Sequence, residues 1–434
     1  MSDSKDPKGR ASGFSHRDIG RELDLFSFHN VAPGAPFWHH KGMVIVKELE
    51  KYIRELQEKN GYQEISTPIM VKEELFKKSG HLENYKENMF KILIGEESEP
   101  AQTFYLKPMN CPESALVYQT KIRSYRDLPL RLAELGRLHR NELSGVLGGL
   151  FRVRQFTMDD AHIYCRRDQI KSEFMNILKM TEEFYQKLGL SVTYGLATRP
   201  EKAMGEKKLW DEAEKFLEEA LKETGLKYQV LEGEGAFYGP KVHFDIKDSL
   251  DRTWTLATAQ LDFQIPERMD LEYIDENGKP QRPAIIHRAI FGTFERFIGV
   301  LIEHFQGAFP LWLAPVQAVL IPVSEKQQKS VEKILEQLKS NGIRAEVYES
   351  GETLPKRVRE AEVQKIPYIL VVGGKEEKND SVNARHKGKP SFAPTPPKQL
   401  RLRRPGKASE GMEKEIKVDE LIKKMKQEIE SKTI

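Results

Sequence analysis

Residues 135–165 read LGRLHRNELSGVLGGLFRVRQFTMDDAHIYC, and this stretch decides the fold. Two segments with strand-like alternation flank a turn rich in small residues: Ser144, Gly145, Gly148 and Gly149. Alternating segments on either side of such a turn are typical of an antiparallel β-hairpin. We therefore predict a hairpin whose two arms belong to one sheet.

Successive side chains point to opposite faces of a strand. One face of the second arm carries five polar, aromatic or sulfur-containing residues: Arg152, Phe156, Met158, Asp160 and His162. The first arm adds Arg140 and Glu142. A face with so many charges cannot be a buried core unless the charges have partners. The pattern predicts a binding or catalytic surface, and a solvated face with incidental charges is the alternative.

The chain has 434 residues, too many for one hydrophobic core, so we expect two or three domains. Its hydrophobic share of 39% and charged share of 31% are typical of a soluble protein, and the net charge of +3 indicates an anionic partner only weakly. Two cysteines exclude a disulfide framework. No apolar run approaches the length of a membrane span, and the first residues lack a secretory signal. We expect a cytoplasmic protein.

The N-terminal polar stretch, to about Gly20, is expected to be mobile. A helix then opens at FWHHKG, residues 37–42, and ends at Gly61. Residues 62–70 alternate like a strand, and Pro68 places that strand at an edge because proline has no N–H. The helix and strand together are a candidate dimer element, although a core helix beside an edge strand fits the pattern equally well.

In the middle of the chain, Cys111 precedes Pro112 as in the first turn of a helix, where a lone cysteine is usually a small buried hydrophobe. Residues 283–300 predict a strand that ends near His287 and then a helix. Arg296 falls in the first turns of that helix, where a guanidinium and the helix dipole would together bind a phosphate. A solvated arginine is the alternative. Further elements are predicted as helices at 171–188 and 207–224 and a strand at 254–263.

The character of the sequence changes at PLWLAPVQ, residues 310–317, which indicates a domain boundary. Beyond it strands and helices alternate, which predicts an α/β unit with a partly parallel sheet. The strands are expected at 318–322, 345–348 and 368–372, and the helices at 331–338, 354–363 and 418–428. The basic, proline-rich residues 387–407 read as a loop that contacts nucleic acid or is simply solvated.

Four longer motifs carry a resemblance to a known family: MNCP at 109–112, RVRQFTMDDAH at 152–162, GEGAFYGPK at 233–241 and IIHRAIFGTFERF at 285–297. The strand with Pro68, the hairpin and the helix with Arg296 also resemble motifs 1, 2 and 3 of class II aminoacyl-tRNA synthetases. Within that class the chain is similar, from about Asp18 onward, to the threonyl-tRNA synthetase family. The resemblance implies an α+β catalytic domain, an antiparallel sheet flanked by helices, followed by an α/β anticodon-binding domain. We place these at residues 19–310 and 311–434, after a mobile N-terminus of residues 1–18.

The resemblance also implies a reaction, the ATP-dependent ligation of threonine to tRNA(Thr) through a threonyl-adenylate. Cys111, His162 and His287 would bind one Zn²⁺ per subunit and leave a position open, as catalytic zinc sites do. A metal that demands a hydroxyl group rejects valine better than a hydrophobic pocket could. Threonine would be bound by three further residues: Asp160 at its hydroxyl, Tyr238 at its amino group, and Gln260.

ATP, with Mg²⁺, would be bound through the same resemblance. Arg140 would bridge the α-phosphate and the carboxylate, and Arg152 and Arg296 would bind the outer phosphates, since a guanidinium fork binds two oxygens at once. Adenine would contact Glu142 and Phe156. Lys241 and Thr258 would line the pocket, Lys241 with a catalytic role. His81 matches a histidine near the tRNA terminus that assists acyl transfer, and Arg385 matches a tRNA contact. A homodimer through the motif 1 helix and strand is implied as well.

Several positions depart from the family pattern near the expected pocket: Glu113, Ser114, Met158, Thr255 and Ala257. In the C-terminal domain the departures are Gly351 and residues 383–387. A diverged paralogue with altered amino-acid or tRNA specificity, or with a regulatory or resistance role, is therefore the alternative function. The catalytic core begins within the first few tens of residues, so we expect a short form without the N-terminal editing region, which would form some Ser-tRNA.

Overall fold

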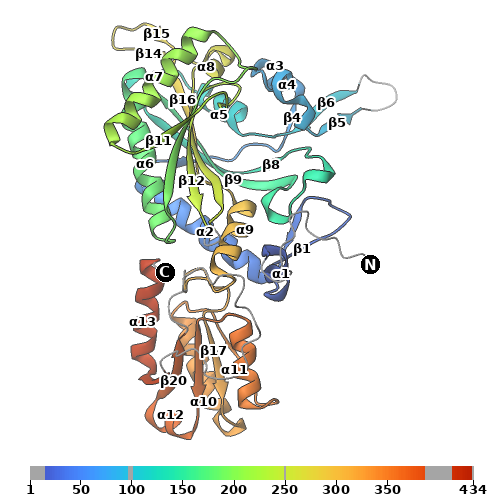
Figure 1. Ribbon diagram of the computed structural model, residues 1–434, viewed down its shortest axis with the longest axis vertical. Helices are drawn as coiled ribbons and strands as arrows, with labels where there is room; N and C mark the ends of the chain where they lie inside the picture. Colours follow the sequence, from blue (N-terminus) through green and yellow to red (C-terminus); the bar gives the residue numbers. More distant parts are fainter. Residues whose placement is uncertain (1–14, 96–100, 249–250, 387–412, 433–434) are drawn as a thin grey trace. The chain divides into compact units, whose positions relative to one another are not determined.

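The computed structural model describes residues 15–95, 101–248, 251–386 and 413–432 (Figure 1). The chain forms two compact units. The larger comprises residues 28–36 and 51–297, and the other comprises the described parts of residues 1–27, 37–50 and 298–434. Helices α2 (His40–Lys59) and α9 (Phe294–Phe305) each contribute residues to both units.

An eight-stranded sheet is the centre of the larger unit (Figure 1), with the order β11-β10-β12-β13-β16-β9-β8-β3. It is antiparallel except for the pairs β10–β11 and β3–β8, which are parallel. This confirms the predicted antiparallel class II sheet. In chain order its strands are β3 (Gln63–Glu64), β8 (Leu130–His139), β9 (Gln155–Cys165), β10 (Val192–Ala197), β11 (Tyr228–Leu231), β12 (Lys241–Lys247), β13 (Thr253–Asp262) and β16 (Ala284–Thr293).

The predicted hairpin is formed by β8 and β9, in a register that pairs Leu132 with His162 and Leu138 with Phe156. Its connecting loop carries two short 3₁₀ turns, at Ser144–Val146 and Gly149–Phe151. Because β9 starts only at Gln155, strict alternation does not extend back to Arg152.

Helices cover the sheet because each has one apolar face that requires burial. α6 (Ile170–Gln186) and α7 (Lys207–Thr224) contact one another, and both contact β13. Both helices were predicted, and the predicted core residues Phe174 and Leu217 have no exposed surface. α5 (Cys111–Gln119) begins at the predicted cysteine, with Pro112 in its first turn, and contacts α8 (Gln264–Met269).

Two small sheets and the short helices α3 and α4 complete the larger unit. The sheets have the orders β4-β6-β5 and β15-β14-β7. The strands of these sheets are β4 (Met70–Lys72), β5 (Lys91–Ile94), β6 (Gln102–Leu106), β7 (Arg123–Ser124), β14 (Tyr273–Ile274) and β15 (Pro280–Gln281). The helices are α3 (Glu73–Lys78) and α4 (His81–Tyr85). Strands β1 (Phe26–Phe28) and β2 (Pro36–Trp38) form a two-stranded sheet before α2, and most of their residues belong to the other unit.

Two predicted strands differ from the structure. The segment 62–70 is not one strand: β3 ends at Glu64 and β4 begins at Met70, with Pro68 between them. The strand expected to end near His287 continues to Thr293. Its last part is irregular, since the register with β9 shifts between Ala289 and Thr293, and Gly292 has a φ of +77°.

The second unit contains a five-stranded sheet of order β18-β17-β19-β20-β21. β17 is parallel to β18 and β19, whereas β20 and β21 are antiparallel, so the partly parallel sheet is confirmed. Its elements are β17 (Ala318–Pro322), α10 (Gln328–Ser340), β18 (Ala345–Val347), α11 (Leu354–Val363), β19 (Tyr368–Val372), α12 (Gly374–Asn379), β20 (Ser381–His386), β21 (Glu413–Lys417) and α13 (Val418–Ser431). The expected basic loop at 387–407 lies outside the described residues.

Helix α1 (His16–Glu22) also belongs to this unit, and His16 Nδ1 lies 2.7 Å from the buried Glu303 carboxylate. Residues 1–14 of the expected mobile N-terminus lie outside the described residues, and its last residues, from His16, are ordered in α1. No helix in the described part of the chain combines the length and apolarity needed to cross a membrane.

Candidate functional site

A cavity of about 270 Å³ in the larger unit collects most of the predicted site residues. Nine of them line it: Cys111, Arg140, Asp160, His162, Tyr238, Lys241, Thr258, Gln260 and His287. They come from the start of α5, the end of the hairpin's first arm, the loop before β12, and strands β9, β12, β13 and β16. Met158 also lines the cavity, so the polar face of β9 faces this space.

Three of the lining residues are potential metal ligands that lie close together. The ligand atoms of Cys111, His162 and His287 all lie within 4.8 Å of one another, and all three side chains are buried. His162 and His287 are direct neighbours in the pairing of β9 with β16, and their rings are almost perpendicular, with centroids 4.9 Å apart. One thiol and two imidazoles are a donor set that suits Zn²⁺ and leaves a fourth position open.

The protonation of these groups fits metal binding. Burial lowers the pKa of His162, so its imidazole is neutral and has a free lone pair. Nε2 of His287 lies 2.9 Å from the Asp262 carboxylate, which leaves Nδ1 for a metal. Burial and the Asp160 carboxylate raise the pKa of the Cys111 thiol, so binding of a cation would be coupled to loss of its proton.

Asp160 lies beside this cluster, with Oδ2 3.9 Å from His162 Nε2. Asn110 Nδ2 donates a hydrogen bond of 3.0 Å to Asp160 Oδ2. Gly136 makes room for this amide, because a Cβ on Gly136 would stand 2.2 Å from Asn110 Oδ1. Three other lining residues form a chain of hydrogen bonds. The Tyr238 hydroxyl donates to Gln260 Oε1 at 2.6 Å, and Gln260 Nε2 donates to Thr258 Oγ1 at 3.2 Å.

Arginines cluster at the hairpin. The Arg140 guanidinium lies over the Phe156 ring, 5.0 Å from its centroid, and its Nε donates to the Pro108 carbonyl. Arg152 pairs with Glu142 at 2.9 Å. Arg296 donates to the Phe151 carbonyl, and burial together with Arg140 and Arg152 lowers its pKa. Three guanidiniums near enough to repel one another are a site for a polyanion.

The short segment 107–111 connects these parts. The Lys107 ammonium forms a buried ion pair of 2.9 Å with Glu134. The backbone carbonyl of Lys107 accepts a hydrogen bond from the His139 N–H. The next residues supply the Pro108 carbonyl to Arg140, the Asn110 amide to Asp160, and the Cys111 thiol.

Six predicted residues are not among those that line this cavity. Four of them belong to the hairpin cluster described above: Glu142, Arg152, Phe156 and Arg296. The other two are His81 and Arg385. His81 has no exposed surface, and its Nε2 lies 3.2 Å from Cys111 Sγ, so it contacts a predicted metal ligand rather than open space. Arg385 lies in the second unit, on β20. Sequence reasoning missed Asp262 and Asn110. Asp262 gave no signal of its own, whereas Asn110 could have been suspected from its place beside Cys111.

Two family models match this chain, one in its larger N-terminal part and one in its C-terminal part. The model of the tRNA synthetase class II core domain (G, H, P, S and T) matches residues 90–305, and that of the anticodon binding domain matches residues 317–428. A crystal structure of the RNA binding domain of threonyl-tRNA synthetase from Cryptosporidium parvum superposes with a TM-score of 0.84 at 36% identity, covering 95% of this chain and 98% of that one. The chain belongs to the threonyl-tRNA synthetase family.

Longer relatives agree with this membership. The threonine–tRNA ligase of Carboxydothermus hydrogenoformans is 52% identical over 373 residues, which is 86% of this chain and 58% of that protein. That of Caldanaerobacter subterraneus is 51% identical over 370 residues. The chain therefore spans somewhat under three fifths of the length of these two relatives.

Proposed function

We propose that this chain ligates threonine to tRNA(Thr), with ATP consumed through a threonyl-adenylate. The observation that carries the proposal is that one cavity is lined both by the Cys111, His162, His287 cluster and by Arg140. An amino-acid site and a phosphate-binding group thus share one space, which a binding module without chemistry would not need.

In the proposed adenylation, a carboxylate oxygen of threonine attacks the α-phosphorus of ATP, and pyrophosphate leaves. Arg140 neutralises charge at the α-phosphate and the carboxylate, while Arg152 and Arg296 bind the outer phosphates, where Mg²⁺ is expected as well. Phe156 stacks on adenine, and Glu142 accepts a hydrogen bond from it. Lys241, whose pKa is lowered by burial, lines the same pocket.

Threonine selection is proposed for the other end of the cavity. Cys111, His162 and His287 would hold zinc, which would supply a Lewis acid for the amino and hydroxyl groups of the substrate. The Asp160 carboxylate accepts a hydrogen bond from the threonine hydroxyl group. The Asn110 amide, which donates to the same carboxylate, orients it. Tyr238 and Gln260, already hydrogen-bonded to each other, face the amino group. Valine has no hydroxyl to offer and is rejected.

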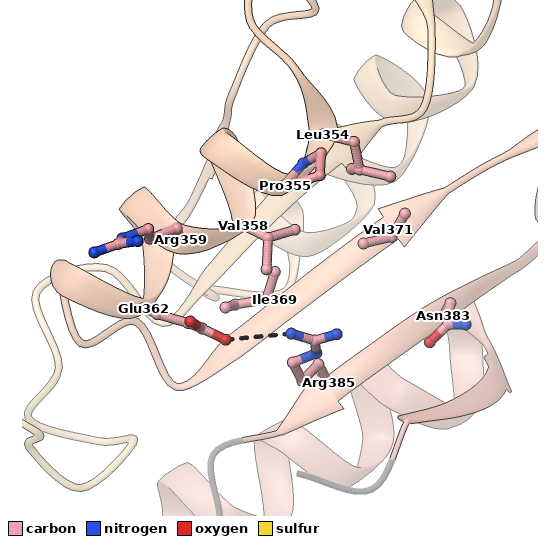
Figure 2. A pocket seen from close by; sticks show the side chains of 9 residues that line it. All are labelled: Leu354, Pro355, Val358, Arg359, Glu362, Ile369, Val371, Asn383 and Arg385. Atoms are coloured by element: carbon pink, nitrogen blue, oxygen red, sulfur yellow. Dashed lines mark hydrogen bonds and ion pairs between the residues drawn. The ribbon is translucent and has the colours of Figure 1, made fainter. Parts of the chain in front are cut away.

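We propose that the tRNA anticodon binds the second unit, because residues 317–428 match the model of the anticodon binding domain. A cavity of about 610 Å³ there is lined by apolar side chains of α11 and β19 and by polar side chains of β20 (Figure 2). Figure 2 shows Arg385 and Glu362 joined across it by an ion pair of 3.2 Å. An apolar wall beside a guanidinium suits an unstacked base.

A homodimer in the cytoplasm is proposed on separate grounds. β3 is the last strand of the eight-stranded sheet, and Ile69 and Met70 after it are 40% and 44% exposed. An edge strand beside exposed apolar side chains suits a symmetric contact between two copies. Both cysteines are free thiols, as in a reducing compartment.

The alternative of altered specificity is favoured by Met158, which lines the cavity, and by Glu113, a buried carboxyl with neither oxygen hydrogen-bonded among the described residues. Pyrophosphate exchange with threonine, serine and valine, followed by charging of tRNA(Thr), separates the two functions. We expect threonine to be used best, serine about 10- to 200-fold less well, and valine not measurably. Exchange driven better by another amino acid than by threonine, or no exchange at all, would overturn the proposal.

A further inference from the structure

Strand β16 bulges away from its partner β9 just before helix α9 begins. The register between the two strands shifts from Ala289 to Thr293, so three residues of β16, 290–292, stand opposite the single residue Asp159 of β9. On its other side, β16 pairs with β13 only as far as Ala289. Gly292 adopts a φ of +77° in this bulge, a conformation that side chains other than glycine rarely adopt. The backbone N–H groups of the bulge therefore need acceptors outside the regular ladder.

The Asp159 carboxylate is the acceptor for all three N–H groups. Oδ2 accepts from the Ile290 N–H at 2.7 Å, and Oδ1 accepts from the Gly292 N–H at 2.8 Å. The Phe291 N–H lies 3.3 Å from Oδ1. The side chain of Asp159 has no exposed surface, and Nη1 of Arg288 lies 3.6 Å from its Oδ2. If this carboxylate were removed, three buried backbone donors would lose their acceptor inside the protein.

Further contacts fix the bulge and the helix that follows it. The Tyr185 hydroxyl of α6 donates to the Ile290 carbonyl at 2.9 Å. After the bulge, the Glu295 carboxyl accepts from the Thr157 N–H of β9 at 3.0 Å. The junction between β16 and α9 is thus tied to β9 at two positions, Thr157 and Asp159, and to α6 at a third.

This junction carries Arg296, which lies in the first turn of α9, four residues after Gly292. Its Nε donates to the Phe151 carbonyl at 2.9 Å. The backbone that leads into a helix sets the direction of its first turn. A displaced bulge would therefore move the Arg296 guanidinium relative to those of Arg140 and Arg152.

We propose that Asp159 is a positioning residue for the nucleotide, which holds the bulge of β16 so that Arg296 is placed to bind the outer phosphates of ATP. The inference rests on the proposed adenylation and deepens it. Neighbouring side chains of a strand point to opposite faces, so Asp159 lies on the face of β9 opposite to Asp160, the residue proposed to bind threonine. Asp159 is not among the residues that line the catalytic cavity. It therefore acts on ATP through Arg296 and leaves the threonine site unaffected.

The experiment measures two equilibrium dissociation constants of the full chain by calorimetry: that of ATP with Mg²⁺ but without threonine, and that of threonine without ATP. In Asp159→Asn an N–H₂ group replaces one acceptor oxygen, so a bulge N–H faces a donor. We expect ATP binding to weaken about 10- to 100-fold, typical of a misplaced binding group, and threonine binding to stay as in the wild type.

Two tyrosine variants form a matched pair. Tyr185→Phe removes the hydroxyl that donates to the bulge, and it should weaken ATP binding in the same sense but less. Tyr194→Phe removes another buried hydroxyl, which donates to Glu182 on α6. Tyr194 lies on β10, and β12 and β13 separate β10 from β16. Tyr194→Phe should therefore change neither dissociation constant.

The double variant Asp159→Asn/Arg296→Ala tests whether the effect passes through Arg296. If it does, Asp159→Asn adds no further loss of ATP affinity once Arg296 is absent, because the two residues act as one unit. Losses that multiply in the double variant would overturn the inference. Unaltered ATP binding in Asp159→Asn, or an equal loss of threonine binding, would overturn it too.

These outcomes leave the proposed function standing, because threonine-dependent pyrophosphate exchange by the wild type tests that function separately. A wild type without such exchange would overturn the proposed function and the inference together. If Asp159→Asn does not fold, Tyr185→Phe and its double variant with Arg296→Ala decide. ATP binding that is unaltered in Tyr185→Phe then contradicts the role of the bulge.

Discussion

Oδ2 of Asp262 lies 2.9 Å from Nε2 of His287, while Oδ1 of the same carboxylate accepts from the backbone N–H groups of Gln264 and Ile265 at the start of α8. One buried side chain thus fixes the end of β13, the first turn of α8 and the tautomer of a predicted metal ligand.

Asp262→Asn tests the tautomer. The amide oxygen still accepts from the two backbone groups, but the amide N–H₂ now faces Nε2 and favours a proton on Nδ1, the nitrogen assigned to the metal. We expect zinc affinity to fall 10- to 100-fold in a chelator competition. Asp270→Asn, an exposed change at the other end of α8, is the control. Unaltered affinity in Asp262→Asn would show that His287 binds through its other nitrogen.

Arg140→Ala and Arg385→Ala test the separation of the two cavities. Arg140 lines the catalytic cavity and Arg385 the cavity of the second unit. We expect threonine-dependent pyrophosphate exchange to fall by about 100-fold or more in Arg140→Ala. Arg385→Ala should retain exchange and lose only efficiency of tRNA charging. Equal losses of exchange in both variants would contradict this division.

Gly136→Ala tests the placement of Asn110. The new methyl group would overlap Asn110 Oδ1 and push the amide away from Asp160. We expect a loss of about 1–3 kcal/mol in the free energy of unfolding, typical of overpacking, and a higher KM for threonine. The double variant Gly136→Ala/Asn110→Ala removes the overlap, so stability should return in urea titrations while the KM stays high. A normal KM in the double variant would exclude a role for Asn110.

Glu295 predicts a pH dependence of stability. Burial raises the pKa of this carboxyl to about 8, from an ordinary value of 4.5. Folding therefore favours its neutral form, and the energetic cost of ionising it appears as the pH rises from about 4.5 to about 8. We expect Glu295→Gln to stabilise the protein relative to wild type more at pH 8.5 than at pH 5, measured by urea unfolding. A difference that does not change with pH would show that Glu295 stays ionised.

The hairpin and its polar face were predictable because period 2 is a local property of the sequence. His162, Asp160 and Met158 therefore fell on the correct side of β9 before any fold was known. The strand end after His287 was misjudged because residues 289–293 contain no proline and no charged residue that would mark where the strand ends and the helix begins. The register shift that carries β16 to Thr293 depends on β9, more than a hundred residues away.

The hydrogen-bond partners of the site residues could not be predicted either, because they are distant from those residues in the sequence. Asp262 and His287 are 25 residues apart, His81 and Cys111 are 30, and Asn110 and Asp160 are 50. Nothing in the local pattern indicates which of these side chains meet in the folded protein. The match of the four motifs to a family supplied the ligands themselves, whereas the groups that hold them in place required the fold.

The segment from Lys107 to Cys111 has a consequence for attempts to redesign the chain. Within five residues Pro108 contacts Arg140, Asn110 contacts Asp160, and Cys111 belongs to the metal cluster. A substitution that shifts this backbone would therefore disturb the residues proposed to bind ATP and those proposed to bind threonine together. Libraries of substitutions in this segment would therefore yield few active variants with a new amino-acid specificity. Met158 lines the same cavity without contacting these groups through hydrogen bonds, so substitutions there change the amino-acid pocket and leave the segment intact.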